Sequence, residues 1–170
     1  GNFVVRLGIP FVIIVVLLIV PSYLAQQNNH FIYGASSLDP SSRAANDTGI
    51  IEKSFGKSQQ LVLLVPREHW GEEKQLLQDL DELEQVTSIV SYQNTVGSQI
   101  PIEFVPQKQL KNFISEHYSR IILTTNTESE GDEAFAAVKK IRELAADHFN
   151  DQYYLVGASA NIYDMKQTVI

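Results

Sequence analysis

The chain carries a short apolar run that ends in proline, SQQLVLLVP at residues 58–66. Its length and its aliphatic side chains are typical of a buried strand, and proline ends the run because it cannot continue the hydrogen bonding of a sheet. We therefore predict a strand over residues 60–65. Because the run is continuous rather than alternating, it also indicates a sheet that is covered on both faces.

A helical pattern follows this strand. Residues 71–86 read GEEKQLLQDLDELEQV, and the acidic Glu72 and Glu73 lie in the first turn, where the helix dipole favours negative charge. The apolar face consists of leucines at helical spacing: Leu76, Leu77, Leu80 and Leu83. The short β-branched segment VTSIVSY at 86–92 predicts a second strand, which completes one β-α-β unit.

A short extra helix is predicted next, over PQKQLKNFISEHY at 106–118. Proline is favoured at the first helical position, where its missing N–H costs little, and Pro106 occupies that position here. The apolar face of this helix is formed by Leu110, Phe113, Ile114 and His117. The segment SRIILTT at 119–125 then predicts a third strand.

The strongest helical pattern is TESEGDEAFAAVKKIRELAADHF at 127–149, with one apolar face made of Val138, Ile141, Leu144, Ala145 and Phe149. Thr127 and Glu130 have the spacing of a capping box, in which two side chains satisfy free backbone N–H groups at a helix start. A fourth strand, QYYLVG at 152–157, ends at Gly157.

Together these elements predict an α+β fold of the split βαβ, or ferredoxin-like, kind with an extra short helix, over residues 55–158. Such a fold places its two long helices on one face of a four-stranded sheet. Since the strands LVLLV and IIL are continuous rather than alternating, we expect a further domain to pack on the other face.

The N-terminal part contains RLGIPFVIIVVLLIVPSYLAQ at 6–26, and Leu7–Ala25 has no charged side chain. About 20 apolar residues span a bilayer as a helix, so we predict a transmembrane helix within residues 1–26. A cleaved signal is an alternative, but cleavage after Ala25 would place bulky Tyr23 three residues before the cut. A buried core helix is a second alternative, although the run is apolar all round.

The distribution of charged residues predicts the orientation of the chain in the membrane and the class of partner that it disfavours. Arg6 is the only cation before the run and Arg43 the first after it, so the positive-inside rule predicts an extracytoplasmic domain attached to the cell membrane. The chain has 13 Lys and Arg against 20 Asp and Glu, a net charge of −7, which disfavours nucleic-acid binding. The absence of cysteine excludes disulfides and thiol catalysis.

Two segments connect the predicted units. Residues 27–54 are rich in Asn, Gln and Ser and show no periodicity, so we predict a linker. Residues 159–170 place Ile162, Met165 and Val169 at helical spacing, which predicts the start of a helix that returns to the membrane. The chain begins GNFVVR without methionine and ends inside this pattern, so we expect a fragment of a longer protein.

No pattern predicts catalysis, a metal or a cofactor, and we expect no enzyme. The acidic clusters lie beside amphipathic helices, which favours a solvated face. The histidines form no metal-binding pair: His30, His69, His117 and His148. The serines tested as nucleophiles, Ser58, Ser91 and Ser159, lack a nucleophile-elbow context. Trp70 could line a ligand site or cap the edge of the core.

The whole chain resembles the N-terminal part of bacterial MMPL-type transporters of the RND superfamily. The resemblance covers the apolar run, NNHFIYGASSLDP, FGKSQQLVLLVP, YSRIILTTNTESEGDEAF and YYLVGASANIYDMK. Its most specific positions, whose roles are unknown, are Phe55 and Gly56, Thr127 and Glu130, and Gly157 with Tyr163, Asp164 and Met165.

The resemblance implies a proton-driven exporter of lipids or other hydrophobic compounds. This chain would supply transmembrane helix 1 and the first extracytoplasmic porter domain, while the proton-relay acids would lie in later helices. The implied partners are the bilayer, a second porter domain and further helices of the same transporter, and a homo-oligomer is left open. The competing interpretation is a membrane-anchored extracytoplasmic binding or sensor module, because ferredoxin-like domains serve many functions.

Overall fold

The computed structural model describes residues 14–15, 17–19, 21–23, 41–97, 100 and 102–169. The chain divides into two compact units, Gly1–Ile32 and Tyr33–Ile170. In the first unit, the described residues between 14 and 23 are helical and exposed. Among the residues that the structure describes, no helix combines the length and the apolar character needed to cross a membrane. Most of the span predicted over Leu7–Ala25 lies outside the described residues.

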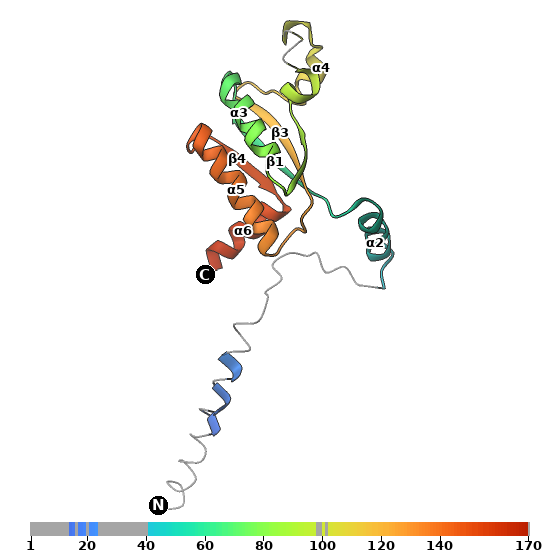
Figure 1. Ribbon diagram of the computed structural model, residues 1–170, viewed down its shortest axis with the longest axis vertical. Helices are drawn as coiled ribbons and strands as arrows, with labels where there is room; N and C mark the ends of the chain where they lie inside the picture. Colours follow the sequence, from blue (N-terminus) through green and yellow to red (C-terminus); the bar gives the residue numbers. More distant parts are fainter. Residues whose placement is uncertain are drawn as a thin grey trace, which may run out of the picture. The chain divides into compact units, whose positions relative to one another are not determined.

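A four-stranded antiparallel sheet forms the centre of the second unit (Figure 1). Its strands are β1 (Gln59–Pro66), β2 (Val86–Val90), β3 (Tyr118–Thr125) and β4 (Tyr154–Gly157). The strand order is β2-β3-β1-β4, so two β-α-β units interleave and each central strand lies between strands of the other unit. The prediction of an α+β fold on a four-stranded sheet is confirmed.

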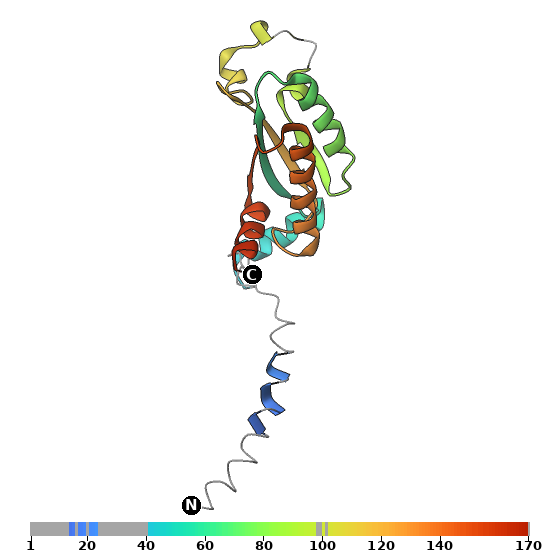
Figure 2. The same cartoon turned by 90° about the vertical axis from the view of Figure 1, so that its left-hand side faces the viewer.

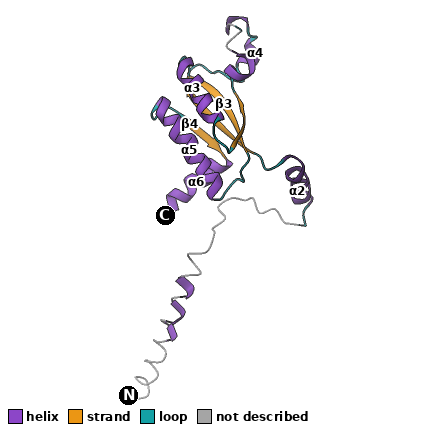
Figure 3. Cartoon of the chain, in the orientation of Figure 1, coloured by secondary structure: helices purple, strands orange, loops and turns teal. Residues whose placement is uncertain are grey.

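Helices α3 (Trp70–Asp81) and α5 (Asp132–Phe149) pack on one face of this sheet (Figures 1 and 2). Helix α6 (Ala158–Val169) follows β4 directly and packs against α5 and β1. The remaining elements of the second unit are short or separate (Figure 3): α2 (Arg43–Phe55), a π-helical turn η1 (Gln93–Gly97), a 3₁₀ turn η2 (Ile102–Phe104) and α4 (Gln107–Leu110).

The core lies between the sheet and the helices. Burial alternates along the strands, because successive side chains point to opposite faces. The sheet contributes Leu61, Leu63, Val65, Ile121, Leu123 and Leu155, and the helices contribute Leu76, Leu77, Leu80, Val138, Ile141, Ala145, Phe149 and Ala160. A second, smaller apolar cluster, called cluster 2 below, consists of Tyr92, Val105 and Ile114 with Trp70, Ile102, Leu110 and Phe113 packed against them.

The opposite face of the sheet is also apolar. A row of four β-branched residues crosses it in register, Val90–Ile122–Val62–Val156. Val62 and Ile122 are half-buried and Val156 is exposed. The continuous apolar sequence of β1 therefore arises because the strand contributes to the core with one face and to this row with the other.

The second half of the segment predicted as a linker, 27–54, contains a helix that the sequence did not predict, because α2 occupies residues from Arg43 onward. The Ser42 hydroxyl accepts a hydrogen bond from the Ala45 N–H at 3.1 Å and caps the helix start. The helix ends at Gly56, which has a φ of 82° and donates its N–H to the Glu52 carbonyl at 2.8 Å. No residue of α2 is buried, and the helix has no apolar face that packs on the core. Apolar periodicity in the sequence therefore could not predict it.

The extra helix predicted over 106–118 is also shorter than expected and ends at Leu110. A turn that starts β3 replaces its second half: Ser115 donates its N–H to the Tyr118 carbonyl at 2.9 Å, and the Ser115 hydroxyl accepts from the Tyr118 N–H at 3.0 Å. Such local side-chain bonds to the backbone compete with a helix. Phe113 and Ile114 pack in cluster 2 as predicted apolar residues, whereas His117 is exposed.

Candidate functional site

The junction between β4 and α6 is unusually tight. Gly157 is the last residue of β4 and Ala158 the first of α6, and Gly157 has a φ of 150°. A β-carbon at Gly157 would lie 2.6 Å from Leu61 Cδ2 and 2.7 Å from the Gln60 carbonyl oxygen. Only glycine fits this position, because any side chain would collide with the backbone of β1. The junction thus holds the start of α6 directly against the central strand.

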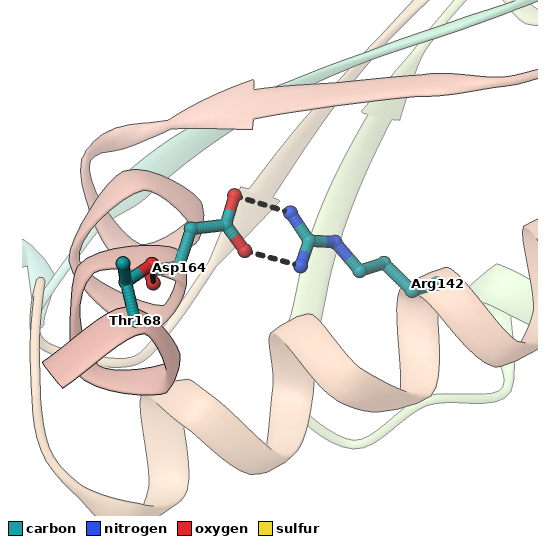
Figure 4. A network of polar contacts seen from close by, with 3 residues as sticks. All are labelled: Arg142, Asp164 and Thr168. Carbon is teal, nitrogen blue, oxygen red and sulfur yellow. Dashed lines mark hydrogen bonds and ion pairs between the residues drawn. The ribbon is translucent and has the colours of Figure 1, made fainter. Parts of the chain in front are cut away.

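A two-pronged ion pair joins α6 to α5 (Figure 4). The two terminal nitrogens of Arg142 donate to the two carboxylate oxygens of Asp164 at 2.5 and 2.8 Å. The Arg142 side chain is 26% exposed and that of Asp164 is 54% exposed. The hydrogen bonds from Arg142 hold the pKa of the Asp164 carboxyl below its ordinary value, although burial opposes this shift. The Asp164 hydrogen bonds likewise raise the pKa of Arg142.

Aromatic contacts extend this ion pair along both helices. Lys166 Nζ lies 4.8 Å from the ring centre of Phe135, and the Phe135 and Tyr163 rings are 5.8 Å apart. The Arg142 guanidinium lies 5.7 Å from the Tyr163 ring centre. Side chains from α5 and α6 alternate along this row of contacts. The row is stabilised by the attraction between cations and ring faces. This α5–α6 clasp consists of Phe135, Arg142, Tyr163, Asp164 and Lys166.

The ion pair between Arg142 and Asp164 should contribute measurably to the stability of the domain. In a double-mutant cycle with Arg142→Met and Asp164→Asn, we expect a coupling free energy of about 1 kcal/mol at neutral pH, since the pair is bidentate but partly solvated. Because the folded state lowers the pKa of Asp164, the coupling is present above the ordinary carboxyl range and is lost as the pH falls through the folded pKa. Denaturant unfolding at pH 7 and pH 3 measures both values.

The matched control lies on the same helix. Lys139 and Glu143 form an exposed i,i+4 pair at 3.7 Å, for which we expect a coupling of about 0.3 kcal/mol. If the Arg142–Asp164 coupling is no larger than that of the control pair, then the clasp does not hold α6 on α5.

The loop between β3 and α5 lies at the same end of the sheet. Lys57 Nζ contacts Glu128 Oε1 at 2.5 Å, and this hydrogen bond raises the pKa of Lys57. The Ser159 hydroxyl donates to the Glu128 carbonyl oxygen at 3.4 Å. Glu128 therefore connects the segment before β1 to the start of α6.

The predicted capping box at Thr127 and Glu130 is wrong, because α5 begins five residues later than its predicted start, after Gly131. Thr127 is buried and its hydroxyl pairs with that of Thr125 at 3.0 Å. Glu130 is half-buried in the bend before α5. Gly131 has a φ of 107°, a conformation that glycine adopts readily, and this residue starts the helix instead.

The structure brings some of the predicted site residues together and not others. Gly157, Tyr163 and Asp164 lie at the junction of β4, α5 and α6, and Thr127 lies in the adjoining loop. Phe55, at the end of α2, is 87% exposed and lies outside both apolar clusters. Met165 is half-exposed on α6.

No family model fits the sequence, and no curated protein is significantly similar to it.

The clasp residues that the sequence did not reveal are Phe135, Arg142 and Lys166. Each lies beside the predicted apolar faces rather than on them, so periodicity gives no signal for them. Arg142 and Asp164 are 22 residues apart in the sequence, and only the packing of α6 on α5 makes them neighbours.

Two other residues that the sequence analysis tested as site residues, His148 and Trp70, make contacts within the fold. His148 Nε2 contacts Asp79 Oδ2 at 2.7 Å and joins α5 to α3. Trp70 packs in cluster 2, with its ring 5.7 Å from that of Tyr92. Within the described ranges, no group of three or more His, Cys, Asp or Glu side chains could hold a metal ion. His148 and Trp70 thus connect elements of the fold.

Proposed function

We propose that this chain supplies the first membrane helix and the first porter domain of a proton-driven MMPL-type exporter of the RND superfamily, which moves lipids or other hydrophobic compounds. The apolar run Leu7–Ala25 would be the membrane helix, and the second unit would be a ferredoxin-like domain outside the cytoplasm. The proposal starts from the sequence resemblance at Gly157 and Tyr163–Met165, and the interleaved β-α-β topology supports it.

The observation that carries the proposal is the attachment of α6. This helix leaves β4 without a loop, and the α5–α6 clasp fixes it to α5. Two of its own residues, Ala160 and Ile162, are buried. A displacement applied to α6 would therefore move the whole sheet and its helices as a body. Rigid-body rocking of one domain against another is a common way to alternate access in transporters.

We expect Asp164→Pro to abolish export. Proline removes a backbone hydrogen bond in the middle of α6 and costs about 3 kcal/mol or more in a helix, so α6 would no longer transmit motion. The measurement is the efflux of a lipophilic fluorescent dye from cells that express the full-length protein. Efflux should fall to the level seen after a protonophore collapses the proton gradient.

Asp164→Asn is the matched control, because it keeps the helix and one hydrogen bond to Arg142 and should retain most of the efflux. The amount of membrane-inserted protein must be equal in all strains. Efflux by Asp164→Pro at the wild-type rate would contradict transmission through α6.

A membrane-anchored binding or sensor module is the second candidate. The apolar row Val90–Ile122–Val62–Val156 on the open sheet face favours it, since such a face suits a partner protein. The coding sequence beyond Ile170 separates the two candidates. A charge-free run of about 20 apolar residues there would support the exporter, whereas a stop codon or a polar domain would support the anchored module.

A further inference from the structure

Glu73 is a buried carboxylic acid on α3 whose oxygens make no well-formed hydrogen bond with the described residues. Its side chain is 1% exposed, although it lies on α3 beside the exposed Glu72. Neither of its carboxylate oxygens makes a hydrogen bond with any described residue, and neither does the Ser119 hydroxyl, which is also buried. Burying an ionised carboxylate without a partner is strongly unfavourable, so the neutral acid is the form that fits this position.

Glu73 lies where the two apolar clusters meet. On α3, Trp70, Glu73, Leu77 and Leu80 follow one another at helical spacing along one face. Trp70 belongs to cluster 2, whereas Leu77 and Leu80 belong to the main core. Glu73 is thus the ionisable residue in an otherwise apolar row, at the point where cluster 2 joins the rest of the domain.

Two neutral polar side chains act on Glu73 from neighbouring elements. They are Ser119 on β3 and Gln93 in η1. Burial raises the pKa of Glu73 above its ordinary value, and weak, poorly aligned hydrogen bonding from these two side chains opposes the shift without cancelling it. Gln93 donates its amide N–H to the Trp70 carbonyl at 3.1 Å. It also lines a hollow of about 240 Å³ with Lys74, Leu77, Gln78, Asp81 and Asn94.

Charged groups on the same elements do not contribute to this shift. On or beside α3 they are Glu68, His69, Glu72, Lys74, Asp79, Asp81 and Glu82; after β1 there is Arg67, and around β3 there are Glu116, His117 and Arg120. Helix α5, which packs against α3, carries Asp132, Glu133, Lys139, Lys140, Arg142, Glu143, Asp147 and His148. Among the residues that the structure describes, Glu73 therefore has no counter-ion that would hold its charge in place once it ionises.

We propose that Glu73 is a proton-binding switch that controls the attachment of cluster 2 to α3. With Glu73 neutral, Trp70, Tyr92 and Ile114 stay packed together in cluster 2. When Glu73 loses its proton, the charge must reach water, and cluster 2 opens because it is the smaller of the two apolar clusters that the face of α3 carrying Glu73 connects. This inference is independent of the proposed transport function, since it concerns the described domain alone.

The single tryptophan of the chain, Trp70, is a built-in probe of this switch. In a fluorescence titration of the 170-residue chain from pH 4 to pH 9, we expect the Trp70 emission to shift to longer wavelength in one single-proton step. The opening constant should rise about tenfold per pH unit between the pKa of the open form and that of the closed form. Hydrogen exchange at Val105 and Ile114, corrected for intrinsic rates, should accelerate in the same range, while exchange at Leu63 should not.

Glu73→Gln, which is neutral at every pH, should keep the low-pH emission throughout. The matched control Glu72→Gln removes an exposed carboxylate from the same helix and should titrate like the wild type. Ser119→Ala removes a group that lowers the pKa of Glu73, so its step should move to higher pH. This third variant keeps the test decisive if Glu73→Gln fails to fold. A pH-independent wild-type emission, a Glu73→Gln variant that still titrates, or a Ser119→Ala step at lower pH would each overturn the switch.

Discussion

Gly157→Ala is expected to lower the free energy of unfolding by about 3–5 kcal/mol, because it combines a collision with backbone strain. The added β-carbon would lie 2.7 Å from the Gln60 carbonyl oxygen, a backbone atom that cannot move without disturbing β1. The φ of 150° is also one that alanine rarely adopts. Since domains of this size are stable by only about 5–15 kcal/mol, the loss should be obvious in a denaturant titration followed by circular dichroism.

Gly131→Ala is the control that separates the two causes. Gly131 also has a positive φ, at 107°, but a β-carbon there would meet nothing within 4 Å. It should therefore cost only the backbone strain, about 1–2 kcal/mol. Equal losses for the two variants would mean that the close approach of β4 to β1 does not matter.

The position of Gly157 also affects the α5–α6 clasp. A variant that pushes the β4–α6 junction away from β1 also moves the start of α6, and with it Tyr163 and Asp164 of the clasp. We therefore expect the Arg142–Asp164 coupling to weaken in any Gly157→Ala protein that still folds.

Leu63→Ala is the second substitution with a large expected effect, a loss of about 2–5 kcal/mol. Leu63 is fully buried on the central strand β1, opposite Ile121 of β3 and Leu155 of β4. Truncation would leave a cavity enclosed by three strands and the helices above them, and a rigid sheet cannot collapse to fill it. Denaturant unfolding at neutral pH measures the loss.

Leu64→Ala is its matched control, because the two leucines are neighbours on the same strand but point to opposite faces. Leu64 is half-buried on the open face of the sheet, so its truncation should cost about 1 kcal/mol or less. A loss as large as that of Leu63→Ala would show that another part of the protein covers this face in solution.

The sequence predicted most of the core correctly because core positions follow simple periods. Leu76, Leu77 and Leu80 recur at helical spacing, and the runs around Leu63 and Ile121 have the length of strands. Sequence reasoning failed where a local hydrogen bond decides the backbone. The Ser42 cap creates α2 without an apolar face, and the Ser115 turn ends a helical pattern early.

The candidate site was predicted in part. Gly157, Tyr163 and Asp164 were singled out by resemblance, without a role, and the structure places them at one junction. Arg142 gave no signal, because the partner of a surface charge depends on which helices become neighbours.

From the amino-acid sequence alone one can predict the order of the four strands and the two long helices, the apolar faces that form the core, and the uncharged run at Leu7–Ala25. These properties depend on residues close together in the chain, whose spacing fixes local conformation and burial. Three further properties are visible only in the folded domain: the need for glycine at Gly157, the pairing of Arg142 with Asp164, and the burial of Glu73 without a well-formed hydrogen bond. Each of these properties depends on segments that are distant in the sequence and become neighbours only when the domain packs. A local sequence pattern does not show which distant segments will be neighbours.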